Sequence, residues 1–309
     1  MEHRSLGNTG LSVSILGYGA SPLGGVFASI DEREGIRAVH TALDAGINYI
    51  DVAPYYGLTR AETVLGQALS GIPRERYFLA TKVGRYGENL FDFSPQRIER
   101  SIDESLTRLG VEYVDLLQCH DIEFTDLRYI IETTLPALQR LRERGKFRFI
   151  GITGLPLKIF QQVLARSEAD TILSYCRYTL ADSSLADLAP TLAERGIGII
   201  NASPLAMGLL SLRGAPAWHP ADAAVKNACR KAAELCAARG YPIEKLAVQF
   251  AIRNRAIHTT LVGTASPAHI ANNIQWASEP IDEELLAEVL ALLEPIHNRT
   301  WIQGRTENN

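Results

Sequence analysis

Eight short runs of apolar residues, rich in Val, Ile and Leu, recur along the chain, and stretches with helical periodicity lie between them. Runs that are apolar almost throughout are typical of parallel strands covered on both faces. Eight such units in 309 residues predict one closed (β/α)8 barrel, the TIM barrel, as a single domain over residues 1–309. The predicted strands are Val13–Gly17, Asn48–Val52, Phe78–Val83, Val114–His120, Phe147–Thr153, Thr171–Cys176, Gly198–Ala202 and Thr259–Gly263.

Local signals predict where several helices begin. Thr59 and Glu62 have the spacing of a capping box ahead of an apolar run. Ser94 followed by Pro95 is typical of an N-cap and a first helical position. Pro136 interrupts the next helical stretch, so we expect it to shift the start of that helix or to kink it.

Ahead of the first predicted strand, His3–Leu6 and Leu11–Ser14 flank the turn-forming segment 7–10, with sequence GNTG. This pattern predicts a β-hairpin that closes the barrel floor.

Two doubly wound halves would also suit the length of the chain. A Rossmann half needs a GxGxxG fingerprint at its first turn, and Gly17–Gly24 comes close to one. The third glycine of that pattern falls on Pro22, and no helix follows at once. The barrel is therefore the favoured interpretation.

Composition excludes several classes of protein. A net charge of −4 gives no indication of a basic surface that would bind nucleic acid or an anionic membrane. No apolar run reaches the ~18 residues that span a bilayer, and the first residues show no apolar signal region. We also find no metal-binding motif. The four cysteines, Cys119, Cys176, Cys229 and Cys236, form no CxxC pair and are interpreted as reduced thiols of a cytoplasmic protein.

Residues with catalytic chemistry follow three neighbouring strands. Asp51 and Tyr56 come at and after the end of the second strand, Lys82 at the end of the third, and His120 at the end of the fourth. In a barrel of this kind the carboxyl ends of the strands carry the active site. We therefore expect these four side chains to converge on one mouth.

The four residue types suit proton transfer to or from a carbonyl or hydroxyl oxygen. A free tyrosine has a pKa near ~10, and a nearby ammonium lowers it. Lys82 would activate Tyr56 in this way, with Asp51 holding the lysine in place. His120 would donate a hydrogen bond to the same oxygen. Taken singly, each has a structural alternative: a loop aromatic, half of an ion pair, or a core histidine.

The segment Asp51–Gly57 (DVAPYYG) resembles the Asp-Thr-Ala-x-x-Tyr-Gly motif of the aldo-keto reductases, and Lys82 and His120 follow at that family's intervals. The likeness covers nearly the whole chain. Further supporting stretches are Leu6–Leu11, Gly19–Gly24, Ser101–Leu106, Cys119–Phe124, Gly151–Leu157 and Ala202–Leu210. The resemblance implies a (β/α)8 barrel with the cofactor extended across its mouth. It also implies Tyr56 as the acid/base, supported by Lys82, Asp51 and His120.

The resemblance also implies a set of residues that contact a nicotinamide cofactor. Thr153 and Ser174 would hold the carboxamide, Gly19 and Ala20 would lie near the reacting half, and Ser203, Pro204 and Leu205 would grip the pyrophosphate. The adenosine end would be read by Gly263, Thr264, Ser266, His269, Asn272 and Asn273. A helix starting near Pro267 would direct backbone N–H groups at phosphate.

Two departures from the family pattern affect the cofactor. Many relatives have a tyrosine that stacks on the nicotinamide where this chain has Ala202. Relatives that prefer NADP often have Lys and Arg at the positions of Gly263 and His269. Because a 2′-phosphate needs paired charge, their absence predicts NAD. Alternatively the loop merely varies, and Arg299 or another cation substitutes.

Candidate substrate contacts are fewer. Asp121 can accept hydrogen bonds from sugar hydroxyls, or it can be a helix cap or half of a structural pair. Phe91, Phe93 and Trp301 are candidates for the pocket wall, and each has packing as its alternative.

Within the family the likeness is greatest to dehydrogenases of free sugars. It implies a cytoplasmic, NAD-dependent enzyme that oxidises the anomeric carbon of an aldose to the lactone, as a monomer or weak dimer. L-galactose is the first choice of substrate, with L-fucose-like aldoses next. The alternatives are a pyridoxal 4-dehydrogenase-like enzyme and a non-catalytic nicotinamide-binding regulatory subunit.

Overall fold

In the computed structural model, which describes residues 1–26 and 29–309, eight parallel strands close into a barrel. The strand order is β10-β3-β4-β5-β6-β7-β8-β9, so neighbours in the barrel are neighbours in sequence, as the repeated strand–helix pattern predicts. The predicted (β/α)8 barrel is therefore confirmed. The barrel strands are β3 (Leu16–Gly19), β4 (Tyr49–Asp51), β5 (Phe78–Val83), β6 (Val114–Cys119), β7 (Phe147–Gly154), β8 (Thr171–Tyr175), β9 (Gly198–Ala202) and β10 (Thr259–Gly263).

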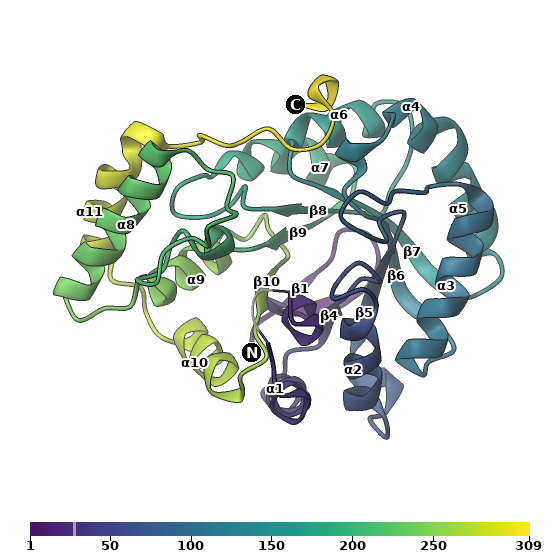
Figure 1. The fold of residues 1–309 in the computed structure, drawn as a ribbon, viewed down its shortest axis with the longest axis horizontal. Helices are drawn as coiled ribbons and strands as arrows, with labels where there is room; N and C mark the ends of the chain where they lie inside the picture. The colour runs from purple at the N-terminus through teal and green to yellow at the C-terminus, as the bar shows by residue number, and fades with distance from the viewer. Residues whose placement is uncertain (27–28) are drawn as a thin grey trace.

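Helices surround the strands on all sides in Figure 1. Those that alternate with the barrel strands are α1 (Glu32–Asp44), α2 (Arg60–Leu69), α3 (Pro95–Leu109), α5 (Leu135–Arg142), α6 (Leu157–Leu164), α7 (Ala189–Glu194), α9 (Ile243–Arg253) and α10 (Pro267–Ser278). The others are α4 (Leu127–Tyr129), α8 (Ala223–Ala238) and α11 (Glu283–Leu293), and α8 packs on α11 at one side of the barrel. Short turns of helix are η1 (Ser21–Gly24), η2 (Arg74–Arg76), η3 (Ile122–Phe124), η4 (Ile130–Thr134), η5 (Ser184–Leu188), η6 (Ala206–Gly208), η7 (Glu294–Ile296) and η8 (Thr306–Asn308). No helix in the described parts of the chain is long and apolar enough to cross a membrane.

The predicted N-terminal hairpin is present and closes the barrel floor. β1 (His3–Ser5) pairs antiparallel with β2 (Ser12–Ser14). Leu6, Leu11 and Val13 are buried in one cluster with inward-facing residues of the barrel, among them Tyr49 and Leu173. Hydrophobic burial thus joins the hairpin to the barrel interior.

The first barrel strand begins later than the sequence pattern predicts. Val13 belongs to β2 of the hairpin, and the barrel strand starts at Leu16. Between the two, Ser14 N donates to Asn48 Oδ1 (2.8 Å) and Asn48 N donates to Ser14 Oγ (3.1 Å). These side-chain bonds replace the strand ladder, which begins only at the Tyr18–Ile50 pair.

Two of the predicted helix signals are confirmed and one is wrong. Ser94 Oγ caps α3 by accepting from Arg97 N, with Pro95 as the first helical residue. Pro136 lies in the first turn of α5, which begins after the π-helical turn η4. The Thr59–Glu62 capping box does not form. Thr59 has a left-handed φ of +80° and makes no cap bond.

Glu62 is instead buried and structural. Its Oε1 accepts from Thr81 Oγ1 (2.6 Å) and its Oε2 accepts from Arg108 Nε (2.7 Å). Glu62 bonds side chains on neighbouring elements instead of capping α2. The spacing of Thr59 and Glu62 alone does not distinguish these two outcomes.

Alternation along the strands decides which side chains reach the barrel interior. Leu116 and Leu173 belong to the interior cluster with the hairpin, whereas Leu117 and Ile172 pack in the core under the helices. Residues two positions further along each strand keep the same direction. This rule places the functional side chains described below.

Candidate active site

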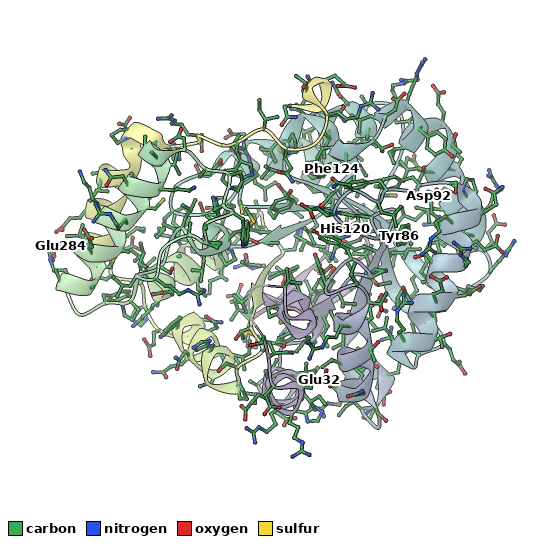
Figure 2. The ribbon with its side chains drawn as sticks, viewed as in Figure 1. Glu32, Tyr86, Asp92, His120, Phe124 and Glu284 are labelled. Carbon is green, nitrogen blue, oxygen red and sulfur yellow. The ribbon has the colours of Figure 1, made fainter. Side chains whose placement is uncertain are left out.

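The four predicted catalytic side chains meet at the carboxyl ends of three adjacent strands. Asp51 ends β4, Lys82 is the penultimate residue of β5, and His120 follows β6 directly. Tyr56 comes from the loop after β4 and is half-buried. In Figure 2 the His120 side chain lies near the middle of the molecule, whereas Glu32 and Glu284 lie at its periphery.

The Lys82 ammonium is held by three acceptors. It forms an ion pair with Asp51 Oδ1, and it donates to Val52 O (3.0 Å) and to Tyr56 Oη (3.2 Å). An ammonium carries three N–H donors, so all of them are used. Because Lys82 donates to the Tyr56 oxygen, the phenol hydrogen is left to face another acceptor.

Burial changes the electrostatics that we expected for Tyr56. Burial raises the pKa of Tyr56 to about 12, and the Lys82 charge lowers it only in part. Burial alone would lower the pKa of Lys82, but Asp51 and Tyr56 outweigh that effect and raise it. The prediction that Lys82 favours the phenolate has the right sign. Its expected net result, a pKa below the ordinary value, is wrong for this structure, because desolvation of the phenol is larger.

His120 is a neutral imidazole at physiological pH. Burial lowers its pKa to about 3, and the Lys82 and Arg85 charges act in the same direction against the opposing Asp121. Its ring lies edge-on to Tyr56, with centroids 5.5 Å apart, and Nδ1 is buried without a hydrogen-bond partner among the described residues. A neutral imidazole has one N–H to donate, which suits the predicted role of binding the reacting oxygen.

Asp121 forms a buried ion pair beside His120. Arg85 Nη1 donates to Asp121 Oδ2 (2.5 Å), which lies 3.6 Å from His120 Nε2. Burial opposes ionisation of Asp121, but the adjacent positive charge lowers its pKa. The structure thus contains the pairing that was the alternative for Asp121. It also places the carboxylate next to His120, the predicted catalytic histidine, and the substrate role of Asp121 stays a prediction.

The aromatic residues proposed for the pocket wall fall in different places. Phe91 stacks on Phe124 with centroids 4.6 Å apart, beside the Arg85 guanidinium. Phe93 is buried in the apolar core. Trp301 packs edge-on against His219, in the loop after β9, at 4.9 Å. Only Phe91 is therefore grouped with the Arg85–Asp121 pair.

Of the predicted carboxamide residues, one lies in the barrel mouth and one does not. Thr153 faces inward, and its Oγ1 accepts from Asp121 N (2.9 Å). Ser174 is the register partner of Asn201, and Asn201 Nδ2 lies 3.5 Å from Thr260 Oγ1 on the helix side of the sheet. Ser174 therefore faces the helix layer, with its Oγ buried and without a partner in the described chain. Its role in binding the cofactor stays a prediction.

The residue that faces inward next to Ser174 is Tyr175. It is the register partner of Ala202, the position where relatives have a stacking tyrosine. Tyr175 Oη donates to Glu123 Oε1 (3.3 Å). The ring of Tyr175 thus lies beside Ala202, which cannot itself stack on a nicotinamide.

Two glycines leave the mouth open between β3 and β10. Gly19 and Gly263 are register partners, and both face inward. Next to them Ala20 is buried, and its N–H donates to Asp51 O (2.8 Å), so its backbone is already engaged. A pair of adjacent strand ends without side chains fits the flat ring and ribose of a dinucleotide.

The predicted pyrophosphate segment is a tight turn at the end of β9. Ser203 has a left-handed φ of +56°, Pro204 is buried and Leu205 is half-buried. The Ser203 carbonyl accepts from Ala206 N (2.8 Å). The turn lies directly after the inward-facing Ala202, and its contact with the pyrophosphate stays a prediction.

The segment predicted to bind the adenosine end starts a helix. α10 begins at Pro267, as predicted, and Ser266 Oγ caps it by accepting from His269 N. Thr264 Oγ1 accepts from Ser266 N (3.0 Å). Asn272 and His269 are exposed, and Asn273 is half-buried. A capped helix N-terminus with exposed polar side chains fits a phosphate and a ribose.

Sequence reasoning missed several buried polar residues at the mouth. Gln118 and Glu123 are buried and Arg85 is half-buried. Gln118 bonds Asp51, Arg85 bonds Asp121, and Glu123 bonds the backbone N–H of Leu155. Burial and the nearby Asp121 charge raise the pKa of Glu123 well above its usual range. Alternation would have found Gln118, since it is two residues before His120. No local signal marks Arg85 or Glu123.

Comparison with known proteins identifies the family to which this chain belongs. The Aldo/keto reductase family profile matches residues 15–294. The chain is 50% identical to L-galactose dehydrogenase from Arabidopsis thaliana, covering 100% of this chain and 99% of that protein. It is 31% identical to D-threo-aldose 1-dehydrogenase from a Pseudomonas species, covering 91% and 94%.

The fold has a counterpart among solved structures. An aldo-keto reductase from Bacillus halodurans, in its holo form, superimposes with a TM-score of 0.81 at 28% identity over 99% of each chain. The family match over residues 15–294 and the full-length relatives show that the chain belongs to the aldo/keto reductase family, whose members are oxidoreductases that use a nicotinamide cofactor.

Proposed function

We propose that this enzyme oxidises the anomeric carbon of a free aldose to the aldonolactone, with NAD as the cofactor. L-galactose is the first choice of substrate and L-fucose-like aldoses are next. The observation that carries the proposal is the Lys82 ammonium, which donates to Tyr56 Oη and so stabilises the phenolate that oxidation requires. The 50% identity to an L-galactose dehydrogenase supports the choice of sugar.

Each residue of the site has a separate role in the proposed reaction. When bound, the nicotinamide supplies the hydride acceptor. The Tyr56 phenolate takes the proton of the anomeric hydroxyl while the hydrogen on the anomeric carbon leaves as hydride, so that this carbon becomes the lactone carbonyl. Neutral His120 donates a hydrogen bond to the same oxygen and fixes its position. The Lys82 ammonium, whose charge is balanced by the Asp51 carboxylate, stabilises the phenolate form of Tyr56.

The Arg85–Asp121 pair supports a polyhydroxylated substrate. Asp121 keeps a carboxylate beside His120, and Arg85 stabilises its charge. An ionised carboxylate accepts hydrogen bonds from several hydroxyls, which a simple aldehyde does not offer. Phe91 and Phe124 present a flat apolar wall beside this polar pair.

We propose NAD rather than NADP because neither Gly263 nor His269, at the predicted adenosine end, carries a permanent positive charge. Gly263 has no side chain, and His269 is exposed at the start of α10. Arg299, the cation considered as a substitute, pairs with Asp222 Oδ2 at 2.6 Å. A guanidinium already paired with a carboxylate is less available for a 2′-phosphate.

Measurement of NAD(P)H formation across a panel of aldoses, with pyridoxal included, tests the proposal. The matched control is Tyr56→Phe, which keeps the ring and removes the acid/base group. Turnover of L-galactose with NAD, absent in the control, is the expected result. Preferred oxidation of pyridoxal would contradict the substrate, and tight cofactor binding without any turnover would favour the regulatory-subunit alternative.

We further propose a cytoplasmic enzyme that acts as one domain over residues 1–309, as a monomer or weak dimer. Light scattering across a range of concentrations tests the oligomeric state. A single cooperative unfolding transition is expected from a single domain, and two separate transitions would contradict it.

A further inference from the structure

Gln118 lies directly behind the catalytic ion pair. It is fully buried on β6, faces the barrel interior, and is the register partner of Lys82 on β5. Its Nε2 donates to Asp51 Oδ2 at 2.7 Å. The amide orientation is fixed, because an ionised carboxylate only accepts and so requires the NH2 end of the side chain.

The two oxygens of Asp51 are therefore divided between two donors. Oδ1 faces the Lys82 ammonium and Oδ2 faces the Gln118 amide. A carboxylate held at both oxygens cannot rotate away from the lysine. A neutral donor also leaves the Asp51–Lys82 pair with no net charge beside Tyr56, whose phenolate is disfavoured by any further negative charge.

The neighbouring strand leaves space for this arrangement. Gly151 on β7 is the register partner of Gln118. A Cβ at residue 151 would lie 2.9 Å from Gln118 Cγ and 2.7 Å from Thr171 Oγ1. Any larger residue at position 151 would therefore require Gln118 or Thr171 to shift.

We propose that Gln118 is a positioning residue for proton transfer: it orients Asp51, and through it Lys82, so that the ammonium remains on Tyr56 Oη. The proposal rests on the proposed acid/base role of Tyr56. It adds Gln118 to Lys82 and Asp51 as a third side chain that supports Tyr56. It does not depend on which substrate the enzyme takes.

Two substitutions test it. Gln118→Met keeps the length of the side chain and removes the donor. Gln118→Glu places a second carboxyl against Asp51, and one of two carboxyls that share a site retains its proton to a raised pKa. While protonated, the introduced carboxyl donates to Asp51 Oδ2 as the amide does. Once ionised, it repels Asp51 and adds negative charge near Tyr56.

The matched control is Gln249→Met. Gln249 is also a buried glutamine, on α9, and it donates to backbone carbonyls of Trp276 and Glu279 away from the site. Thermal unfolding and NADH fluorescence first establish that each variant is folded and binds cofactor. The assay is sugar oxidation or, if no sugar is oxidised, reduction of a small aromatic aldehyde, so failure of the substrate proposal leaves this test intact.

For Gln118→Met we expect kcat to fall about tenfold to a hundredfold, the range for a buried hydrogen bond to a charged group, with KM changed less than about twofold. For Gln118→Glu the ratio of variant to parent kcat should fall at least tenfold between pH 6 and pH 9, as the introduced carboxyl ionises. Gln249→Met should lower Tm and leave the kcat ratio flat with pH. If Gln118→Met keeps more than half of the parent kcat, or if the Gln118→Glu ratio is flat with pH, the positioning role is wrong.

Discussion

Lys82 Nζ lies 3.2 Å from Tyr56 Oη, and this contact uses the last of the three hydrogens on the ammonium. The geometry fixes the direction of the hydrogen bond: lysine donates and tyrosine accepts. The tyrosine hydrogen is thus available to a substrate oxygen, which is the arrangement that an acid/base residue requires.

Tyr56→Phe should abolish turnover and leave cofactor binding nearly intact. The ring keeps its edge contact with His120, while the group that exchanges the proton is lost. General acid–base catalysis contributes roughly 10²–10⁴-fold, so kcat should fall by at least that lower figure. Steady-state turnover and NADH fluorescence titration measure the two effects. A variant that retains more than about a tenth of the parent rate removes Tyr56 from this role.

Lys82→Met should lower kcat for oxidation and move the acid limb of its pH profile to higher pH. The Lys82 charge lowers the pKa of Tyr56 against the effect of burial, so its removal raises that pKa further. Oxidation needs the phenolate, and a higher pKa means that less of it is present at any given pH. kcat measured from pH 6 to pH 10 shows the shift. An unmoved limb would mean that the profile reports a different group.

Gly24→Ala should reduce activity through the catalytic loop. A Cβ on Gly24 would lie 2.7 Å from the carbonyl carbon and oxygen of Tyr56. Backbone atoms cannot yield as a flexible side chain does, so the loop after β4 must shift. Overpacking of this kind costs about 1–3 kcal/mol of stability. We expect kcat to fall below a tenth of the parent value while the protein is still folded at the assay temperature. Parent-like kcat would show that Tyr56 tolerates the shift.

The strand pattern was enough to predict the barrel and the place of the four candidate catalytic residues at one mouth. Parallel strands bring their carboxyl ends together, so Asp51, Lys82 and His120 needed only correct strand ends to be placed in one mouth. Residues whose partners come from distant segments were not predictable. Glu62 pairs with Arg108 rather than capping α2, and Asp121 pairs with Arg85, because ion pairs across elements depend on packing. Ser174 shows a third limit: an apolar run does not tell which face of a strand a residue occupies, and Ser174 faces the helix layer.

Cys119→Ala should lower stability and keep turnover. Cys119 packs in the core under the helices, on the opposite face from Gln118 and His120, as strand alternation predicted. Burial raises the pKa of its thiol to about 12, so no reactive thiolate is present at neutral pH. Removal of a buried sulfur should cost about 1 kcal/mol. Chemical denaturation measures that loss, and an inactive but well-folded variant would contradict the strand register.

The cofactor preference should be NAD, and His269→Arg should narrow the gap to NADP. Residue 269 is exposed on the first turn of α10, where its backbone N–H donates to Ser266 Oγ. Thr264, Ser266 and Asn272 offer neutral hydrogen-bond partners, which suffice for a ribose diol. A 2′-phosphate brings up to two negative charges, and Gly263 offers nothing to meet them.

An arginine at position 269 adds a planar, permanently charged fork that suits phosphate. A charge-assisted contact contributes roughly 1.5–3 kcal/mol, or about ten- to a hundredfold in affinity for NADP. The measurement is kcat/KM with both cofactors for parent and variant, and His258→Arg is not a suitable control because that histidine is tied to Ile199 N. His3→Arg, at an exposed position on β1 of the hairpin that closes the barrel floor, is the better one. If the parent already favours NADP, cations outside the 263–273 segment hold the 2′-phosphate. If the parent favours NAD and the variant has the same cofactor preference, the segment is placed correctly and the role of residue 269 alone is wrong.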